Sequence, residues 1–143
     1  MGIGALNAST TFAGKFQGNA KLTKVGNGTL SITGVPTYAG PTTVNGGVLS
    51  IGNGGTTGSL PATTVTIGAA GTLAYNRSDD ITNTLTFTGT GSVAKEGANT
   101  LTVSSGFSGF TGTLNVNGGS GDDPRHDSSN PRHDQSSITA DAE

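Results

Sequence analysis

Residues 24–54 of the 143-residue chain read KVGNGTLSITGVPTYAGPTTVNGGVLSIGNG. Apolar residues alternate with small polar residues in this stretch, as at Leu30 and Ile32. Alternation with a period of two predicts strands that bury one face. The clusters between such pairs, at residues 26–28 and 45–47, are rich in Gly and Asn, which tolerate positive φ and therefore favour bends. The stretch predicts short strands separated by tight bends.

The same pattern returns later in the chain as an internal repeat. Its two copies keep one constant offset, the one that separates Phe16 from Phe87. The matching pairs are Phe16-x-Gly18 with Phe87-x-Gly89, Lys24-Val25-Gly26 with Lys95-Glu96-Gly97, Thr29–Ile32 with Thr100–Val103 and, after one inserted residue, Val44–Gly47 with Val116–Gly119. Composition bias alone rarely keeps a constant offset over so many positions, so we interpret this as a true repeat.

A shorter repeat runs inside the longer one. It consists of a Gly or Asn, a small residue and an aliphatic residue, and one aliphatic residue per turn gives Leu30, Leu49, Leu73, Val93 and Leu114. A hairpin meander gives no reason for a recurrence at intervals of about 20 residues. In a parallel β-helix, by contrast, equivalent residues stack about 4.8 Å apart. The sequence therefore predicts an all-β fold, a parallel β-helix (β-solenoid) of about five coils.

Composition and charge exclude several classes of protein. The chain has no cysteine, so disulfides and thiolate metal sites are excluded. Residues 1–121 carry five basic and three acidic residues, whereas residues 122–143 carry two and six. Neither part has the basic density of a nucleic-acid binder, and no stretch approaches the roughly 18 apolar residues of a membrane helix. We expect no nucleic-acid partner and no membrane insertion by this chain, and its N-terminus lacks the pattern of an export signal.

The end of the chain follows different rules from the body. From Gly121 the strand alternation stops, and a seven-residue unit occurs twice, at residues 124–130 and 131–137. Segments of Pro, Asp, Ser and Arg without aliphatic residues cannot bury a core. The predicted organisation is an N-terminal lead-in over residues 1–11, the β-helix over residues 12–120, and a disordered acidic, histidine-containing tail over residues 121–143.

Several motifs of the body resemble those of a known family. They are Lys24-x-Gly26-x-Gly28-Thr29-Leu30-x-Ile32, Thr37-Tyr38-x-Gly40-x-Thr42-x-Val44-Asn45-x-Gly47-x-Leu49, Gly71-Thr72-Leu73-Ala74-Tyr75-Asn76-Arg77-Ser78-Asp79, and a second copy from Gly89. Over about residues 14–119 the chain resembles the autotransporter-associated β-strand repeat of bacterial passenger regions and surface proteins. The resemblance implies a right-handed parallel β-helix exported to the cell surface, and it implies no enzymatic activity.

Two motifs of the tail contain metal-ligand residue types. Residues 118–123 match the first six positions of a calcium-binding nonapeptide, but only one copy is present and Arg125 stands where an apolar residue belongs. His126-Asp127 and His133-Asp134 could jointly ligate zinc or copper. We favour a flexible junction for the first motif, and in a disordered tail any site formed by the second would be weak and unspecific. The prediction is that no metal is bound.

The densest charge cluster of the body is Asn76-Arg77-Ser78-Asp79-Asp80. An active-site interpretation would make Asp79 or Asp80 a general acid or base. The structural interpretation pairs Arg77 with a neighbouring carboxylate where a loop leaves the coil after Tyr75. We favour the structural role, and we expect no catalytic and no cofactor-binding residues.

A threonine series gives the sharpest binding alternative. Residues 82–90 contain a threonine at every second position, which would place five threonines on one strand face if the segment is extended. Flat threonine arrays can bind ice, but they need threonine pairs at the same place in every coil. Thr64-x-Thr66 and Thr100-x-Thr102 are candidate partners, whereas the coils from Leu30 to Leu49 do not keep the register. An ordinary Thr-rich outer face is the favoured interpretation.

The sequence thus predicts a non-enzymatic structural module that resembles a passenger stalk or spacer at the bacterial surface or outside the cell. The first alternative is a subunit that forms homo-oligomers by stacking its open β-helix ends into a filament. The second is a protein that binds ice or a surface glycan through a Thr-rich face, and a host ligand is a further candidate partner.

Overall fold

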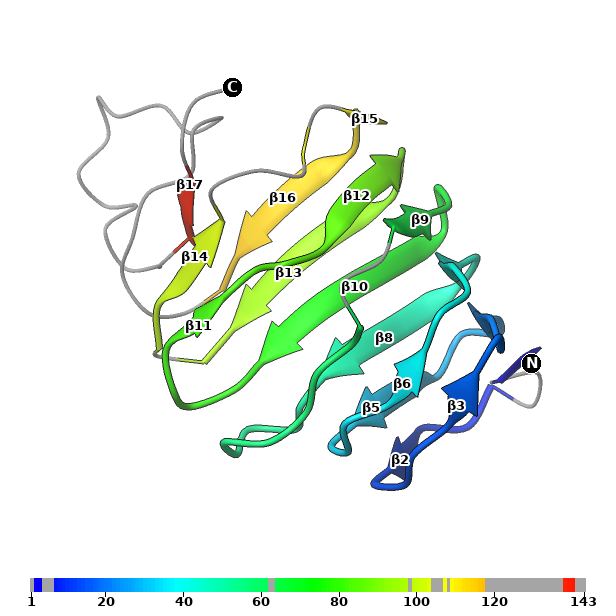
Figure 1. Ribbon diagram of the computed structural model, residues 1–143. Helices are drawn as coiled ribbons and strands as arrows, with labels where there is room; N and C mark the ends of the chain where they lie inside the picture. The colour runs from blue at the N-terminus through cyan, green and yellow to red at the C-terminus, as the bar shows by residue number, and fades with distance from the viewer. Residues whose placement is uncertain are drawn as a thin grey trace.

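The computed structural model describes residues 7–61, 64–97, 99–103, 107 and 109–117, together with the backbone of residues 2–3 and 138–140. All regular elements in this part of the chain are strands, and the pairings between them are parallel. The strands wind as a coil around one axis and line three sides of a prism (Figure 1). The predicted all-β parallel β-solenoid of about five coils is therefore confirmed.

Two sides of the prism are continuous six-stranded sheets. Face A contains β1 (Gly2–Ile3), β4 (Leu22–Lys24), β7 (Thr42–Val44), β9 (Thr64–Ile67), β12 (Thr86–Gly89) and β15 (Gly109–Phe110). Face B contains β2 (Thr10–Phe12), β5 (Thr29–Ile32), β8 (Gly47–Ile51), β10 (Gly71–Asn76), β13 (Ser92–Glu96) and β16 (Thr113–Val116). In both sheets the strands follow one another in the order of the chain.

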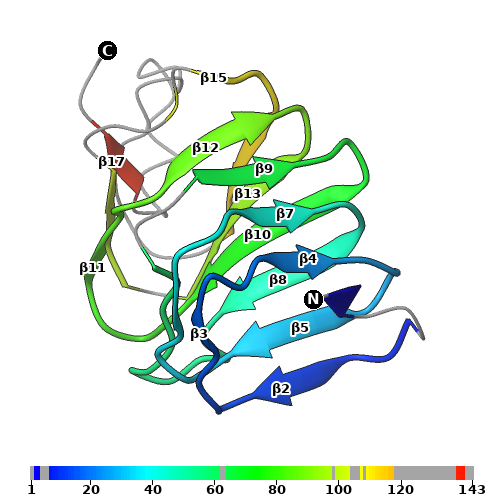
Figure 2. The same ribbon diagram turned by 45° about the vertical axis from the view of Figure 1, so that its right-hand side comes forward.

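The third side, face C, is interrupted. It contains a pair, β3 (Gln17–Gly18) and β6 (Thr37–Tyr38), and a separate set of three, β11 (Ile81–Thr82), β14 (Leu101–Val103) and β17 (Ile138–Ala140). Of these short strands, β11 and β17 lie along the left side of Figure 2. Between the two sets, residues 52–61 run from β8 toward β9 without forming a strand. This loop accounts for the longest interval of the short repeat, the one from Leu49 to Leu73.

The predicted column of aliphatic residues is confirmed residue by residue. On face B the register places Leu30 against Leu49, Leu49 against Leu73, Leu73 against Val93, and Val93 against Leu114. The first four are at most 2% exposed, and Leu114 is partly buried at the last coil. A neighbouring column runs through Ile32, Ile51 and Tyr75, all of them buried. The core is therefore a stack of identical positions from successive coils.

Glycine opens almost every strand of face B because the coils approach each other closely there. A Cβ added to Gly71 would lie 2.3 Å from the Val44 carbonyl oxygen, and one added to Gly112 would lie 1.9 Å from that of Gly91. Neither glycine has positive φ. The glycines at these two places are therefore required by contact with the preceding coil, whereas Gly26 and Gly47, in the clusters predicted to form bends, do have positive φ.

The long repeat does not return to the same side of the prism. Lys24 ends β4 on face A, but its counterpart Lys95 lies in β13 on face B. In the same way, the face B strand Thr29–Ile32 corresponds to a face C segment that contains β14, Leu101–Val103. The offset between the two copies is thus three coils and one further face. The three faces accept the same sequence pattern, because each is a short strand followed by a glycine-rich corner.

Short segments near both ends of the chain pair with strands of the solenoid through their backbone. The lead-in contributes β1 and the start of β2, which pair with β4 and β5. Of the tail, Ile138–Ala140 forms β17 and pairs with β14, while residues 121–137 and 141–143 lie outside the described residues. The boundaries at 11 and 120 and the disorder of the tail stay predictions. In the part of the chain that is described, no helix is long and apolar enough to cross a membrane.

Candidate functional site

The side chain of Lys24 is fully buried in the corner that follows β4. Its Nζ donates hydrogen bonds to the carbonyl oxygens of Val25 at 2.7 Å, Gly26 at 3.1 Å and Gly46 at 3.1 Å. An ammonium group has three donors, and all three are used here. Gly46 belongs to the next coil, so Lys24 ties two consecutive corners together. Gly47 leaves room for it, because a Cβ there would lie 2.7 Å from Nζ.

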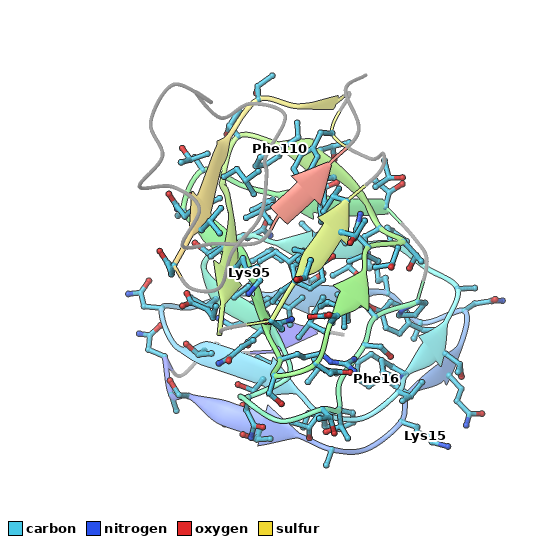
Figure 3. All side chains as sticks on the ribbon, turned by 90° about the vertical axis from the view of Figure 1, so that its left-hand side faces the viewer. Lys15, Phe16, Lys95 and Phe110 are labelled. Carbon is cyan, nitrogen blue, oxygen red and sulfur yellow. The ribbon has the colours of Figure 1, made fainter. Side chains whose placement is uncertain are left out.

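Lys95 repeats this arrangement on the next face of the prism. Its Nζ donates to the carbonyl oxygens of Glu96 at 3.0 Å and Gly97 at 2.9 Å, as Lys24 does to the two residues that follow it. The third acceptor is the side-chain oxygen of Asn99 at 2.8 Å. Figure 3 shows Lys95 within the outline of the coils, whereas Lys15 points away from them. The K-x-G motif is therefore a corner in which a buried ammonium group binds backbone carbonyl groups.

Burial lowers the pKa of both corner lysines, because the charged form loses hydration. For Lys95 the carboxylates of Glu96 and Asp80 act in the opposite direction. Sequence reasoning found both lysines as repeat partners but did not predict that they are buried. The available signal was the repetition of the motif itself, since a solvent-exposed lysine has no reason to recur before a corner glycine.

The charge cluster at residues 76–80 has the structural role that the sequence favoured. Arg77 binds Asp79 in a bidentate manner, with Nε 2.8 Å from Oδ1 and Nη2 2.5 Å from Oδ2. The guanidinium group also donates to the carbonyl oxygens of Gly58 at 2.7 Å and Thr56 at 2.8 Å. The hydrogen bond from Arg77 lowers the pKa of the Asp79 carboxyl group. The predicted pairing of Arg77 is confirmed, and it holds the loop 52–61 against the next coil.

The rest of the cluster connects to the coil that follows. The Asp80 carboxylate accepts a hydrogen bond from the Thr100 backbone N–H at 2.7 Å. The Asn99 amide donates to the Asp79 carbonyl oxygen at 2.6 Å. Oxygen atoms of both aspartates thus accept hydrogen bonds that join one corner to the next. This agrees with the structural role that the sequence favoured for the cluster.

A small pocket of about 80 Å³ lies where face C is interrupted. Its lining includes Leu60 from the loop 52–61, together with Tyr75, Arg77, Asn83 and Leu85 from the following coil. The Tyr75 hydroxyl group donates to the Asn83 side-chain oxygen, and Asn83 donates to the Leu85 carbonyl oxygen at 2.8 Å. Burial raises the pKa of Tyr75. The pocket has room for a few water molecules, and the buried Tyr75 and Asn83 side chains that line it are bonded to each other.

The five threonines of residues 82–90 do not share one strand face, because the segment is not extended throughout. Thr82 ends β11 on face C, the chain turns at residues 83–85, and only Thr86 and Thr88 lie in β12 on face A. Asn83 is buried at this turn, which ends the extended segment.

The threonines of β12 nevertheless stack over threonines of earlier coils. Thr86 lies opposite Thr64 and Thr88 opposite Thr66, as the sequence suggested, and the hydroxyl groups of the second pair are 3.0 Å apart. On face C, Thr102 lies opposite Thr82, so it is a partner of that threonine and not of Thr86 or Thr88. The second column also continues through Thr43 to Thr23. One column on the outside of face A is thus threonine through four coils, in a register that the sequence had not predicted.

Residues 118–123 and the two His-Asp pairs, at residues 126–127 and 133–134, lie outside the described residues. Within the described ranges, no group of three or more His, Cys, Asp or Glu residues is placed to hold a metal ion. The absence of catalytic, cofactor-binding and metal-binding residues therefore stays a prediction.

The passenger-associated-transport-repeat family matches the chain twice, over residues 22–51 and 93–120. The first match begins at β4 on face A and the second begins inside β13 on face B. The two matches thus differ in phase by one face, as the long repeat does. The resemblance to an autotransporter-associated repeat is confirmed.

A curated relative points to the same kind of protein. The chain is 48% identical over 64 residues to the Adhesin BmaC autotransporter of Brucella suis biovar 1 (strain 1330). The matched stretch is 45% of this chain but 2% of that adhesin. No solved structure matches the chain at a significant level.

Proposed function

Because the chain carries two passenger-associated transport repeats, we propose that it is a non-enzymatic structural module, a stalk or spacer of a bacterial surface protein. The family and the named adhesin relative support a passenger-like module exposed at the cell surface or outside the cell. The fold supports the role as well, since five coils stacked about 4.8 Å apart extend the protein along one axis by about 24 Å.

The unbroken column from Leu30 to Leu114 is the observation that carries this proposal. A spacer has to transmit length without bending, and a column of residues in constant register holds each coil on the one below. The corner contacts act in the same direction, because Lys24 reaches a carbonyl oxygen of the next coil. Arg77, Asp80 and Asn99 likewise form hydrogen bonds between successive coils.

Surface display tests the proposal. The chain, with an N-terminal epitope, replaces the passenger of a bacterial autotransporter, and intact cells are labelled with an antibody and treated with trypsin. We expect labelling of intact cells and no cleavage after Lys24 and Lys95, because both side chains are buried. The control is the same fusion with Leu49→Asp, which places a charge in the core and should be cut at both lysines.

Two results would contradict the spacer proposal. One is labelling that requires permeabilised cells, since the chain would then not be exposed at the surface. The other is a labelled chain that is cleaved after Lys24 as fast as the Leu49→Asp control, since it would then be exported without forming stacked coils.

Self-assembly is a second candidate, favoured by the N-terminal end of face B. In the described part of the chain β2 pairs only with β5, which leaves backbone groups along its outer edge for another strand. Thr10 at this edge belongs to the same column as Leu114 in the last coil, so a second copy could continue the register.

Stacked copies would form filaments with strands perpendicular to the long axis. Negative-stain microscopy at high protein concentration should show them, and Phe12→Lys at the N-terminal edge should shorten them. Monodisperse small particles at every concentration would rule this candidate out.

Binding of ice or glycan is a third candidate, favoured by the threonine column of face A. Thr64 and Thr86 form a second pair beside it, and both are exposed. Thr86→Val with Thr88→Val should reduce thermal hysteresis or retention on a glycan matrix, whereas Thr72→Val with Thr113→Val on face B should not. A wild-type chain that shows neither hysteresis nor retention contradicts this candidate.

A further inference from the structure

The tandem heptads of the tail separate two short sequences that are joined earlier in the chain. Asp79-Asp80-Ile81-Thr82 leads into face C at β11. Near the C-terminus, Asp122-Asp123 is followed by the two heptads of residues 124–137 and then by Ile138-Thr139. If the heptads are set aside, the same four residues occur in the same order.

The backbone register gives the same correspondence independently of the sequence. β11 pairs with β14 so that Ile81 lies opposite Leu101. On its other side β14 pairs with β17 so that Leu101 lies opposite Ile138 (Figure 1). Ile81, Leu101 and Ile138 therefore occupy one column of face C, and Thr139 occupies the column of Thr82 and Thr102.

The length of the connection also fits an interrupted corner. Residues 77–80 connect β10 to β11, and residues 97–100 make the equivalent connection from β13 to β14. The next such connection, from β16 to β17, spans residues 117–137, and the heptads occupy its second part, 124–137. Without the heptads only residues 117–123 remain, seven residues against the four of each of the other two connections, so the heptads make up most of the extra length.

We propose that Ile138–Ala140 is the face C strand of the coil that β15 and β16 begin, and that the tandem heptads are an insertion in the corner before it. The strand covers the edge of β14 within the same molecule, so this end of face C is closed by a segment of the chain itself. The inference does not rest on the proposed spacer function, and it places the end of the solenoid beyond the predicted boundary at residue 120.

Hydrogen-bond directions in β14 provide a test at single residues. The carbonyl oxygens of Thr100 and Thr102 accept bonds from the N–H groups of Ile81 at 2.9 Å and Asn83 at 2.7 Å. Consecutive residues of a strand direct their backbone groups to opposite neighbours. The backbone groups of Leu101 and Val103 therefore face β17, whereas those of Thr102 face β11.

The experiment compares two deletions of equal length in the otherwise full chain. Removal of residues 124–137 takes out the heptads and joins Asp123 to Ile138, whereas removal of residues 127–140 takes out β17. Amide hydrogen exchange is followed by NMR. In the second variant, exchange of the Leu101 and Val103 amides should rise about tenfold or more while that of Thr102 changes little. In the first variant all three rates should stay near wild type.

Either of two results would overturn the proposal. Unchanged exchange of Leu101 and Val103 after removal of residues 127–140 would show that β17 does not cover β14. Fast exchange of both after removal of residues 124–137 would show that the heptads are not an insertion. Protection of Leu49 and Ile51 in β8 verifies that each variant is folded, and Thr139→Pro, which removes one ladder N–H without shortening the chain, should reproduce the loss at Leu101 and Val103.

Discussion

Lys24 and Lys95 show how a single residue type can define a corner of this fold. Each ammonium group is fully buried, and each binds the carbonyl groups of the two residues that follow it. A corner leaves carbonyl groups without strand partners, and burial of such groups is costly unless a donor reaches them. A long, flexible side chain with three donors meets this need.

Lys24→Met tests the cost of losing that donor. Methionine fills similar space but leaves three carbonyl groups without the ammonium, so we expect unfolding free energy to fall by about 2 to 4 kcal/mol. Chemical denaturation measures the change. Lys15→Met, at an exposed lysine, is the control and should stay within about 0.5 kcal/mol. Equal effects of the two substitutions would contradict the structural role of the buried ammonium group.

Tyr75→Phe tests how the free energy of unfolding changes with pH in the alkaline range. Burial raises the pKa of Tyr75 above its ordinary value of 10.0, so the folded protein holds the phenol proton more tightly than the unfolded chain. The resulting stability is present below pH 10 and is lost as the pH rises above it. The variant should therefore lose less stability than wild type between about pH 9 and 11 in urea titrations.

Lys24 and Lys95 change the stability in the opposite direction as the pH rises. Their pKa is lowered from 10.5 in the folded state, so their contribution to stability rises as the pH climbs toward 10.5. Both proteins in the comparison contain these lysines, so the difference between the two pH profiles reports Tyr75. Identical profiles would contradict the assignment.

At the scale of the element, the glycine that opens a face B strand sets how close two coils can lie. Gly71→Ala would place a Cβ 2.3 Å from the Val44 carbonyl oxygen, so backbone has to shift. We expect unfolding free energy to fall by about 1 to 3 kcal/mol, the usual range for overpacking. Gly55→Ala is the matched control, because that Cβ has no atom within 4 Å and the backbone φ is not positive. A tolerated Gly71→Ala would show that the coils can separate there.

Arg77 fixes the one long loop of the described coils. Arg77→Ala removes the donors to the Gly58 and Thr56 carbonyl oxygens, so the loop loses contacts with the following coil. Amide exchange should accelerate at Ser59, whose N–H binds the Gly34 carbonyl oxygen, but not at Leu49 in β8. Arg77→Lys should not restore protection, because an ammonium group lacks the planar fork. Unchanged protection of the Ser59 amide in Arg77→Ala would contradict the role of Arg77 in holding the loop.

For the whole molecule, stability depends on position along the axis. A residue in a central coil packs between two neighbouring coils, whereas a residue in an end coil packs against one neighbouring coil. Leu49→Ala, at a fully buried central position, should lower unfolding free energy by about 2 to 5 kcal/mol. Leu114→Ala, partly buried in the last coil of the same column, should cost about 1 kcal/mol. Chemical denaturation compares them, and equal losses would contradict the stacked core.

The repeat was readable from the sequence because each coil is built from local spacing. Alternation marked the strands, and the Gly-small-aliphatic triplet marked the entry to face B. The recurrence of one aliphatic residue per coil, from Leu30 to Leu114, gave the column that the register confirms. The pairing of Arg77 was also predictable, since its carboxylate partner Asp79 is close in the sequence.

Other features depend on what the neighbouring coil supplies. Whether Lys24 is exposed or buried is decided by the carbonyl group of Gly46, one coil later, and whether the threonines of residues 82–90 share a face is decided by a turn at the buried Asn83. The phase of the long repeat, one face per copy, appears only when the strands are assigned to sheets.

The sequence by itself determined that the chain coils, how long each coil is and which aliphatic residues stack. The tertiary structure alone decided which face each strand joins, that two lysines lie inside, and that Ile138 falls in the column of Ile81. The physical reason is the distance along the chain over which each interaction acts. Strand period and bend propensity act over a few residues, whereas close approach, burial and register arise between residues one coil or more apart.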